Sequence, residues 1–414
     1  MSSVVVQERT PWFHRYPGRF TSSVAFEMLT HIKRELSSPP ELVLDPFVGT
    51  GTSLSCLAHH GISSIGIEIN PLALLICNVR FAPPSNVERT AEALLQLAED
   101  CKKAEPSWAD SDIELSRWMG AENVNHLRAV LNRIELEAHA RQRNWMRLAV
   151  SNSLRSASVW LSGSIKPQRD PNRTPAPFSD SLRRSVYALK RDTLLEAKPQ
   201  APIAVLAADA CAVPIVDNSV DAILTSPPYL TMYDYFDVQR LSFLAFGWNR
   251  SSELQIGRQS QISPDGFAFV PPSALKKWYR DVYKGEQSVE GRSIRLYSQR
   301  LEAAVSEQVR VLKLGGVACY AIADSIRRDG VLELTKAVSE LFERNGLKIV
   351  KVLPRATSHR RILPAGRDPL TGRFSSNLGM AGVAEQIIVA KKTASHLFEL
   401  PCSSAKASEA QPIE

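Results

Sequence analysis

The chain has 414 residues, a length at which one large domain with an insertion and two smaller domains are both expected. Hydrophobic residues make up 44% of it and charged residues 22%, the composition of an ordinary soluble globular protein. The formal charge of +7 favours a polyanionic partner, although many basic proteins bind no nucleic acid.

The amino-acid sequence also argues against several classes of protein. The 6 cysteines are scattered without CxxC spacing, which argues against a zinc site or a disulfide framework and for a reducing cytoplasm. The N-terminus lacks the pattern of a signal peptide, and no apolar run approaches the length of a membrane span. We therefore expect a soluble cytoplasmic protein with no metal ion and no membrane partner.

Residues 1–84 show the order of elements found at the start of a nucleotide-binding sheet. Residues 24–36 have helical spacing and end at "SSPP". A buried strand, "ELVLDPF", runs into the glycine loop "VGTGT", and "SLSCLAHHG" is expected to be the next helix. "SSIGIEI" is a second strand ending at Glu68, followed by a helix that starts with proline at "PLALL". This order predicts the first half of a doubly wound α/β fold.

Residues 85–200 have a different pattern, which we interpret as a helical insertion. Amphipathic helices are predicted over 88–104, 121–140 and 144–161, and no strand-like alternation occurs.

A pattern of strands and helices typical of an α/β fold resumes over 201–392. The strands predicted there are 201–210, 220–229, 311–324, 347–355 and 384–392, with a helix at 331–346. The polar tail 393–414 is expected to be frayed.

The loop "DPFVGTGTS" has the chemistry of a cofactor loop. Gly49 and Gly51 let the backbone turn sharply and approach a ligand closely. The loop lacks a full GxGxxG and no GK[ST] follows, so a dinucleotide or a triphosphate is poorly supported. Asp45 could reach a cationic ligand group, and Glu68 ends the second strand, where a carboxylate commonly binds both ribose hydroxyls. The alternative is a plain strand-turn-helix, against which the position of Glu68 argues.

Three motifs carry a resemblance to a known family. "DPFVGTGT" resembles the DPFxGxGT motif of S-adenosylmethionine-dependent amino-methyltransferases acting on DNA, and "TSPPY" resembles their catalytic motif. "RYPGRF" is similar to the short motif that closes over methionine in that family. The resemblance covers about half the chain. It implies a Rossmann-like, seven-stranded, mostly parallel sheet, S-adenosyl-L-methionine as cofactor, double-stranded DNA as partner, and restriction-modification beside a cognate restriction nuclease.

The resemblance also implies which residues surround the cofactor. The methionine and sulfonium end would be lined by Asp45, Phe47, Gly49, Gly51 and Thr52. The adenosine end would be held by Glu68 at the ribose, Asn70 beside the adenine, and Asp209 of "AADA" near the adenine amine. The lid would be formed by Tyr16, Pro17 and Phe20.

The motif "TSPPY" suits methyl transfer to a base amine. Such an amine is a poor nucleophile until its nitrogen becomes pyramidal, and acceptors outside the ring plane stabilise that form. The Ser226 hydroxyl and the Pro227 carbonyl could accept the two amine hydrogens, while Pro228 keeps the loop rigid. Tyr229 offers a flat face to a base swung out of the duplex. Alternatively, the prolines simply end a strand and Tyr229 packs in the core.

The amine itself is predicted from Ser226. In the resembled family, serine at this position is usual for cytosine N4 enzymes, whereas aspartate or asparagine is usual for adenine N6 enzymes. Cytosine N4 is therefore favoured. The open alternatives are an adenine N6 enzyme, an RNA or protein-glutamine methyltransferase of the same fold, and a catalytically silent nucleic-acid binding module.

Basic residues concentrate in three segments that we expect to be irregular, 166–173, 274–300 and 354–373. Arginine and lysine interleaved with aromatic residues suit phosphate neutralisation and contact with base edges, although each run could also be a solvated loop. The last is predicted to lie on a surface hairpin between the closing strands. Recognition of a DNA sequence is assigned to the 85–200 insertion, to residues 249–300, or to both.

Overall fold

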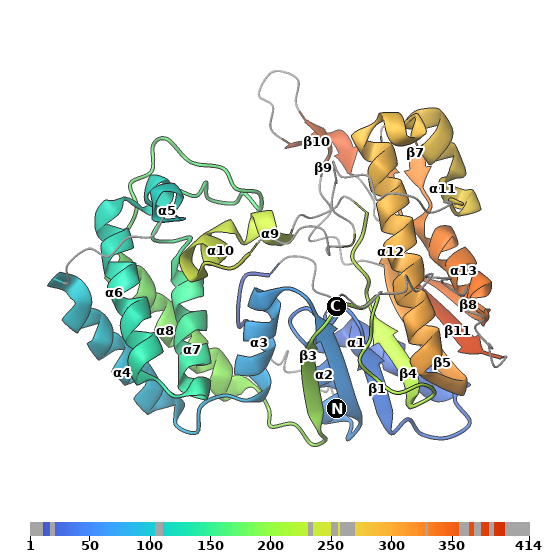
Figure 1. Cartoon of the computed structure of the whole chain (residues 1–414), viewed down its shortest axis with the longest axis horizontal. Coiled ribbons are helices and arrows are strands. Elements are labelled where there is room, and N and C mark those ends of the chain that lie inside the picture. The colour runs from blue at the N-terminus through green and yellow to red at the C-terminus, as the bar shows by residue number, and fades with distance from the viewer. Residues whose placement is uncertain are drawn as a thin grey trace, which may run out of the picture.

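The computed structural model describes residues 11–16, 21–103, 111–230, 235–249, 256, 270–327, 330–355, 364–367, 374–380 and 385–393. It has a sheet lobe and a helical lobe, which lie on either side of helix α3 (Pro71–Phe81) (Figure 1). In this part of the chain no helix combines the length and apolar character needed to cross a membrane.

The sheet lobe is built on seven strands in the order β3-β2-β1-β4-β5-β11-β8. Their bounds are β1 Leu42–Asp45, β2 Ser63–Glu68, β3 Ile203–Ala207, β4 Val220–Thr225, β5 Leu312–Ala323, β8 Leu347–Arg355 and β11 Glu385–Lys392. Neighbours from β3 to β5 pair in parallel, and β11 is antiparallel to both β5 and β8. The predicted seven-stranded, mostly parallel α/β fold is confirmed.

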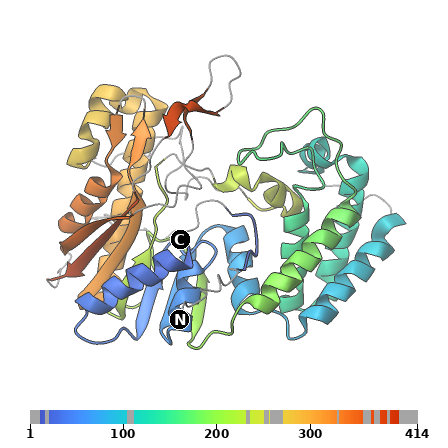
Figure 2. The same ribbon diagram turned by 180° about the vertical axis from the view of Figure 1, so that it is seen from behind.

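Helices cover both faces of this sheet, which explains the nearly continuous apolar strands. Helices α1 (Ser22–Glu35) and α2 (Thr52–His59) lie on one face, and α1 is seen in front of the sheet in Figure 2. Helices α12 (Val289–Val311) and α13 (Leu334–Arg344) bury their apolar sides on the other face. The carboxyl ends of the strands are left free of these helices to form loops.

The prediction of an irregular segment at 274–300 is wrong. The segment contains α11 (Ser273–Lys277), a π-helical turn Trp278–Val282, a 3₁₀ turn Gly285–Gln287 and the first half of α12. Its many arginines disguise the helical spacing of Ile294, Tyr297 and Leu301, which are all buried against the sheet. Two of those arginines, Arg295 and Arg300, pair with carboxylates of the protein itself.

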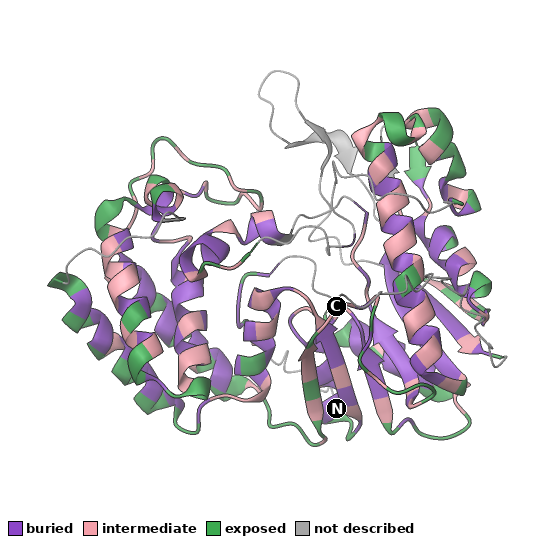
Figure 3. Ribbon diagram, in the orientation of Figure 1, coloured by how far each residue is buried: buried purple, intermediate pink, exposed green. Residues whose placement is uncertain are grey.

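The helical lobe contains α4 (Val87–Asp100), α5 (Ser111–Met119), α6 (Ala121–Glu137), α7 (Ala140–Ser153) and α8 (Phe178–Leu195). Among the described residues of 85–200 there is no strand, in keeping with the predicted helical content; α5 and α8 were not predicted. Helices α9 (Tyr235–Val238) and α10 (Arg240–Phe246), which come after "TSPPY", lie beside these helices, and α10 shares their core (Figure 1). The buried faces of the helices meet inside the lobe (Figure 3).

Two small antiparallel sheets lie outside the main one. Strands β6 (Ser325–Arg327) and β7 (Gly330–Leu332) pair with each other, as do β9 (Pro364–Arg367) and β10 (Phe374–Met380). The second pair comes between β8 and β11 in the chain, where the sequence predicted a hairpin. The basic residues of 356–363 and 368–373 lie outside the described residues.

Candidate active site at the ends of two neighbouring strands

The glycine loop and "TSPPY" follow strands that are neighbours in the sheet. Strand β1 leads into the glycine loop, and Thr225 of "TSPPY" is the last residue of β4. The two strands pair in parallel, with Leu44 opposite Ile223, so both motifs emerge at the same edge. The strand order reverses between β1 and β4, which is where ligands bind in open α/β sheets.

Asp45 joins the two motifs through its side chain. It is 1% exposed. Its Oδ1 accepts hydrogen bonds from the Thr225 hydroxyl at 2.5 Å and from the Phe47 backbone N–H at 3.0 Å. Its Oδ2 accepts one from the Ser53 hydroxyl. Burial raises the pKa of Asp45 to about 6, against the pull of these donors. The Asp45 side chain thus links the glycine loop to "TSPPY" by hydrogen bonds. Its contact with a cationic ligand group stays a prediction.

Thr225 is a residue of this site that sequence reasoning missed, since it received no role there. Replacing it with valine should lower the free energy of unfolding by about 1–3 kcal/mol, because a buried carboxylate loses a donor. Thr225→Ser, which keeps the hydroxyl, is the matched control and should stay near wild type. Urea denaturation measures both, and equal stabilities of the valine and serine variants would contradict the role given to this hydroxyl.

The glycine loop packs closely against α3. Gly51 caps α2 in the left-handed region at φ 76°, and a Cβ there would lie 2.6 Å from the Phe81 ring. The Cys77 thiol donates to the Gly49 carbonyl at 3.3 Å. Gly49 is also left-handed, at φ 53°, and its missing Cβ would lie 3.9 Å from the Tyr16 ring.

The other residues predicted around this loop have different settings. Thr52 is the first residue of α2 and is buried. Phe47 is half-buried against the core beneath α12. The Tyr16 ring lies close to Gly49, whereas Pro17 and Phe20 lie outside the described residues. The role of Tyr16 toward a cofactor stays a prediction.

A pair of glycine substitutions separates backbone strain from this packing. Gly61→Ala, at φ 71° with open space around it, should cost about 1–2 kcal/mol of folding free energy from the left-handed conformation alone. Gly51→Ala carries the same strain and also drives a methyl group into Phe81, so it should cost about 1–3 kcal/mol more. Thermal or urea unfolding of the two variants compares them directly, and similar losses would show that contact with α3 does not limit this position.

The end of α8 holds the glycine loop from the helical side. Arg80 of α3 donates to the Thr50 carbonyl at 3.1 Å and pairs with Glu196 at 2.8 Å. The Ser55 hydroxyl of α2 donates to the same Glu196 oxygen at 2.8 Å. Both partners of the ion pair are nearly buried. The last residues of the helical insertion therefore fix the loop that sequence analysis assigned to the cofactor.

Glu68 is held by backbone N–H groups at the end of β2. Its Oε2 accepts from Gly49 at 3.0 Å, and its Oε1 accepts from Ile69 and Asn70 at 2.9 Å each. Burial raises the pKa of Glu68 to about 7 despite these donors. A carboxylate fixed beside the glycine loop has the geometry to accept further hydroxyl donors, which fits the predicted ribose contact.

Asn70 and Asp209 are both engaged in contacts within the protein. The Asn70 side chain caps α3 by accepting from the Leu72 N–H at 3.0 Å, and it donates to Gln239 Oε1 at 2.9 Å. Asp209 follows β3, as predicted, and accepts from Arg300 at 2.6 Å. Their contacts with an adenine stay predictions. Gln239, from α9–α10, is a link between the lobes that sequence analysis missed.

Residues 226–229 form a short loop with a polar chain behind it. Pro227 is buried, and Ser226 is half-buried with its hydroxyl 3.4 Å from the Tyr229 hydroxyl. The Tyr229 hydroxyl in turn donates to Glu385 Oε1 at 3.4 Å, and Glu385 pairs with Arg355. Glu385 was missed by sequence analysis, because it comes from the last strand of the sheet.

No group of three or more His, Cys, Asp and Glu side chains is placed to hold a metal ion in the described ranges.

No family model matches the chain. Curated relatives do match it. The type II methyltransferase M.BsoBI of Geobacillus stearothermophilus is 24% identical over an alignment of 304 residues that covers 64% of this chain and 58% of the relative. The chain is thus similar, at low identity, to type II methyltransferases.

A second curated relative matches over more of its length. The type II methyltransferase M.MvaI of Kocuria varians is 19% identical over 88% of this chain and 87% of its own. The chain spans less than two thirds of M.BsoBI.

Solved methyltransferase structures also match, at low scores. An S-adenosylmethionine-dependent methyltransferase of Methanosarcina mazei aligns with a TM-score of 0.32 and 9% identity, over 88% of this chain and 98% of its own. The rRNA methyltransferase aviRa of Streptomyces viridochromogenes aligns with a TM-score of 0.31 and 13% identity, over 92% and 89% of the two chains. The fold assignment rests on the strand order itself.

Proposed function

We propose that this relative of type II methyltransferases transfers a methyl group from S-adenosylmethionine to the exocyclic amine of a base swung out of duplex DNA, with cytosine N4 as the amine. The observation that carries the proposal is the hydrogen bond between Thr225 and Asp45. This bond connects "TSPPY" to the strand that leads into the glycine loop, at the sheet edge where the strand order reverses.

The residues of the chain fit the cofactor. A bound S-adenosylmethionine would supply a methyl group activated on a sulfonium. Gly49 would leave the backbone bare beside that position, Gly51 lets the loop pack against Phe81, and Glu68, oriented by three backbone N–H groups, would accept the ribose hydroxyls. Tyr16 would cover the loop, while Asn70 and Asp209 would border the adenine. The pKa of Glu68 is raised to about 7 because its carboxylate is shielded from water. Hydrogen bonds donated by the ribose hydroxyls would stabilise the ionised form.

Ser226 and Pro227 would act on the amine. The Ser226 hydroxyl and the Pro227 carbonyl would accept its two hydrogens, which stabilises the pyramidal nitrogen as positive charge develops. Tyr229, whose hydroxyl is tied to Ser226 and Glu385, would present its ring to the base. After transfer the nitrogen is cationic and gives up its proton readily, so no strong base is required.

Duplex DNA as the substrate is supported by the motifs, by the positive net charge and by the relatives, which are named as type II methyltransferases. The same names support a place in restriction-modification, with a cognate nuclease as partner. The test offers tritium-labelled S-adenosylmethionine to the protein together with duplex DNA, single-stranded RNA or a cell-free protein mixture. Label in DNA alone is expected, and label confined to RNA or protein would overturn the proposed substrate.

A further inference from the structure

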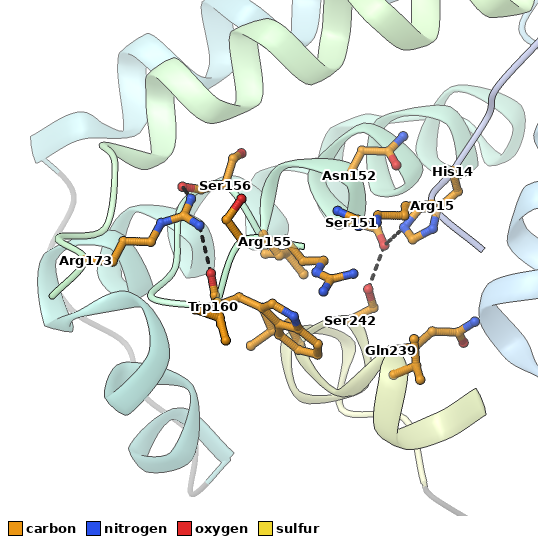
Figure 4. Close-up of a pocket in the computed structure, with 15 residues that line it drawn as sticks. His14, Arg15, Ser151, Asn152, Arg155, Ser156, Trp160, Arg173, Gln239 and Ser242 are labelled. Carbon is orange, nitrogen blue, oxygen red and sulfur yellow. Dashed lines mark hydrogen bonds between the residues drawn. The ribbon is translucent and has the colours of Figure 1, made fainter. Parts of the chain in front are cut away.

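A pocket of about 320 Å³ lies in the helical lobe, next to the candidate active site (Figure 4). Its walls come from the segment before the lid, from α7 and the loop after it, and from α9 and α10. Gln239 lines the pocket and also accepts the hydrogen bond from Asn70 at 2.9 Å. The pocket is therefore one side chain away from the residues assigned to the cofactor, yet none of the roles given above uses it.

Three arginines line this pocket, and we call them the arginine triad: Arg15, Arg155 and Arg173. Figure 4 shows Arg173 at one end, Arg15 at the other, and Arg155 between them. Arg155 lies over the Trp160 ring, 4.0 Å from its centroid, and donates to the Ser164 carbonyl at 2.5 Å. Arg173 donates to the carbonyls of Trp160 and Ser156. These contacts fix two guanidinium groups in place without neutralising them.

The triad has no counter-charge within the described residues. None of its three members forms an ion pair with a carboxylate there. Burial, and after it the positive charges of Arg15 and Arg173, together lower the pKa of Arg155 to about 10. With a pKa of about 10, the Arg155 guanidinium is still protonated at neutral pH. A partly buried cluster of like charge is unfavourable unless an anion joins it.

The rest of the wall adds hydroxyl groups and no acid. His14 is buried, its pKa is lowered to about 4 by burial, and it is therefore neutral. It contacts the Ser151 hydroxyl at 2.9 Å, and Ser151 contacts the Ser242 hydroxyl at 2.7 Å (Figure 4). Arginine forks and hydroxyl donors match the oxygens of a phosphate group.

We propose that the arginine triad binds a backbone phosphate of the DNA substrate. This proposal rests on the proposed function, because it takes DNA as the molecule that supplies the phosphate. Helices α9 and α10 follow "TSPPY" in the chain and form part of the pocket wall. If a base is bound at Ser226, the DNA backbone that carries it would pass near this lobe. A free phosphate or nucleotide has the same chemistry, and the experiment separates the two sources.

The main arm measures binding of a fluorescein-labelled duplex across a series of salt concentrations. Each lost phosphate contact should weaken binding and reduce the slope of log K against log salt by about 0.9. We expect this for Arg15→Gln, a change at an exposed position, and for Arg155→Gln. Arg155→Lys should recover the slope because it keeps the charge. Arg141→Gln, on the exposed surface of α7 outside the pocket, is the matched control and should equal wild type.

The second arm measures the Tm with inorganic phosphate as the probe. A phosphate-dependent rise of Tm in wild type that is lost in Arg15→Gln, together with the slope change, supports the proposal. The same rise without any slope change would assign the pocket to a free anion and overturn it. Unchanged slopes and no rise of Tm would overturn it altogether. If wild type bound no DNA, the proposed function and the DNA phosphate would both fail, while the Tm arm would still decide whether the triad binds anions.

Discussion

Ser226→Ala is expected to lower the rate of methyl transfer by about 100-fold while the affinity for S-adenosylmethionine stays within about twofold of wild type. The reason is that Ser226 is assigned to the amine alone. Removing one preorganised hydrogen-bonding group from a site where charge develops typically costs about 10²–10³ in rate. The variant also frees the Tyr229 hydroxyl from a 3.4 Å contact, while its contact with Glu385 is retained.

The matched control is Ser219→Ala, just before the opposite end of the same strand. The Ser219 hydroxyl donates to the Val216 carbonyl at 2.6 Å, far from the edge that carries "TSPPY". Single-turnover rates with saturating cofactor should therefore match wild type for Ser219→Ala and fall only for Ser226→Ala. Loss of cofactor binding in Ser226→Ala, seen by calorimetry, would mean that the division of roles between the two motifs is incorrect.

Glu68→Gln is expected to weaken S-adenosylmethionine binding by about 10–100-fold. An ionised acceptor of two hydroxyl groups is replaced by a neutral amide, and hydrogen bonds to charged groups contribute about 1.5–3 kcal/mol. The amide also presents N–H groups to backbone donors, so the support from Gly49 or Asn70 is lost as well. Glu41→Gln, an exposed change just before the opposite end of β1, is the control and should bind normally.

The pH dependence of binding gives this prediction a second readout. The ionised form of Glu68 accepts the ribose hydroxyls, so wild-type affinity should rise as the pH increases through about 7, and Glu68→Gln should remove that rise. In the absence of ligand, the contribution of Glu68 to folding stability changes with pH in the opposite direction. The folded protein holds the Glu68 proton more tightly than the unfolded chain does, so this residue's contribution to stability falls as pH rises from 4.5 through about 7. A binding curve of equal pH dependence in both proteins would exclude Glu68 as the ribose acceptor.

The local pattern of the sequence was sufficient for most of the sheet lobe. The glycine loop between β1 and α2, the acidic end of β2 and the proline in the first turn of α3 all appear where periodicity and helix-start signals predicted them. These features depend on neighbouring residues, so a short window of sequence contains the necessary information.

Contacts between distant segments could not be predicted in the same way. Thr225 meets Asp45 only because β4 lies beside β1, and the order of strands is not written in either segment. Glu385 reaches Tyr229 from 156 residues away. The arginine triad is assembled from the N-terminal segment and the loop after α7, of which sequence analysis noted only the basic segment 166–173. In each case the information lies in the topology, which a single sequence does not state.

The most direct test of the central claim is the identity of the methylated nucleoside. Unmethylated duplex DNA is treated with the protein and S-adenosylmethionine, digested to nucleosides and analysed by mass spectrometry against standards. The proposed function, with serine at position 226, predicts N4-methylcytosine, formed about 100-fold more slowly when Ser226→Ala is used. N6-methyladenine would contradict the assignment of the amine, and 5-methylcytosine or no methylated nucleoside would contradict the mechanism itself.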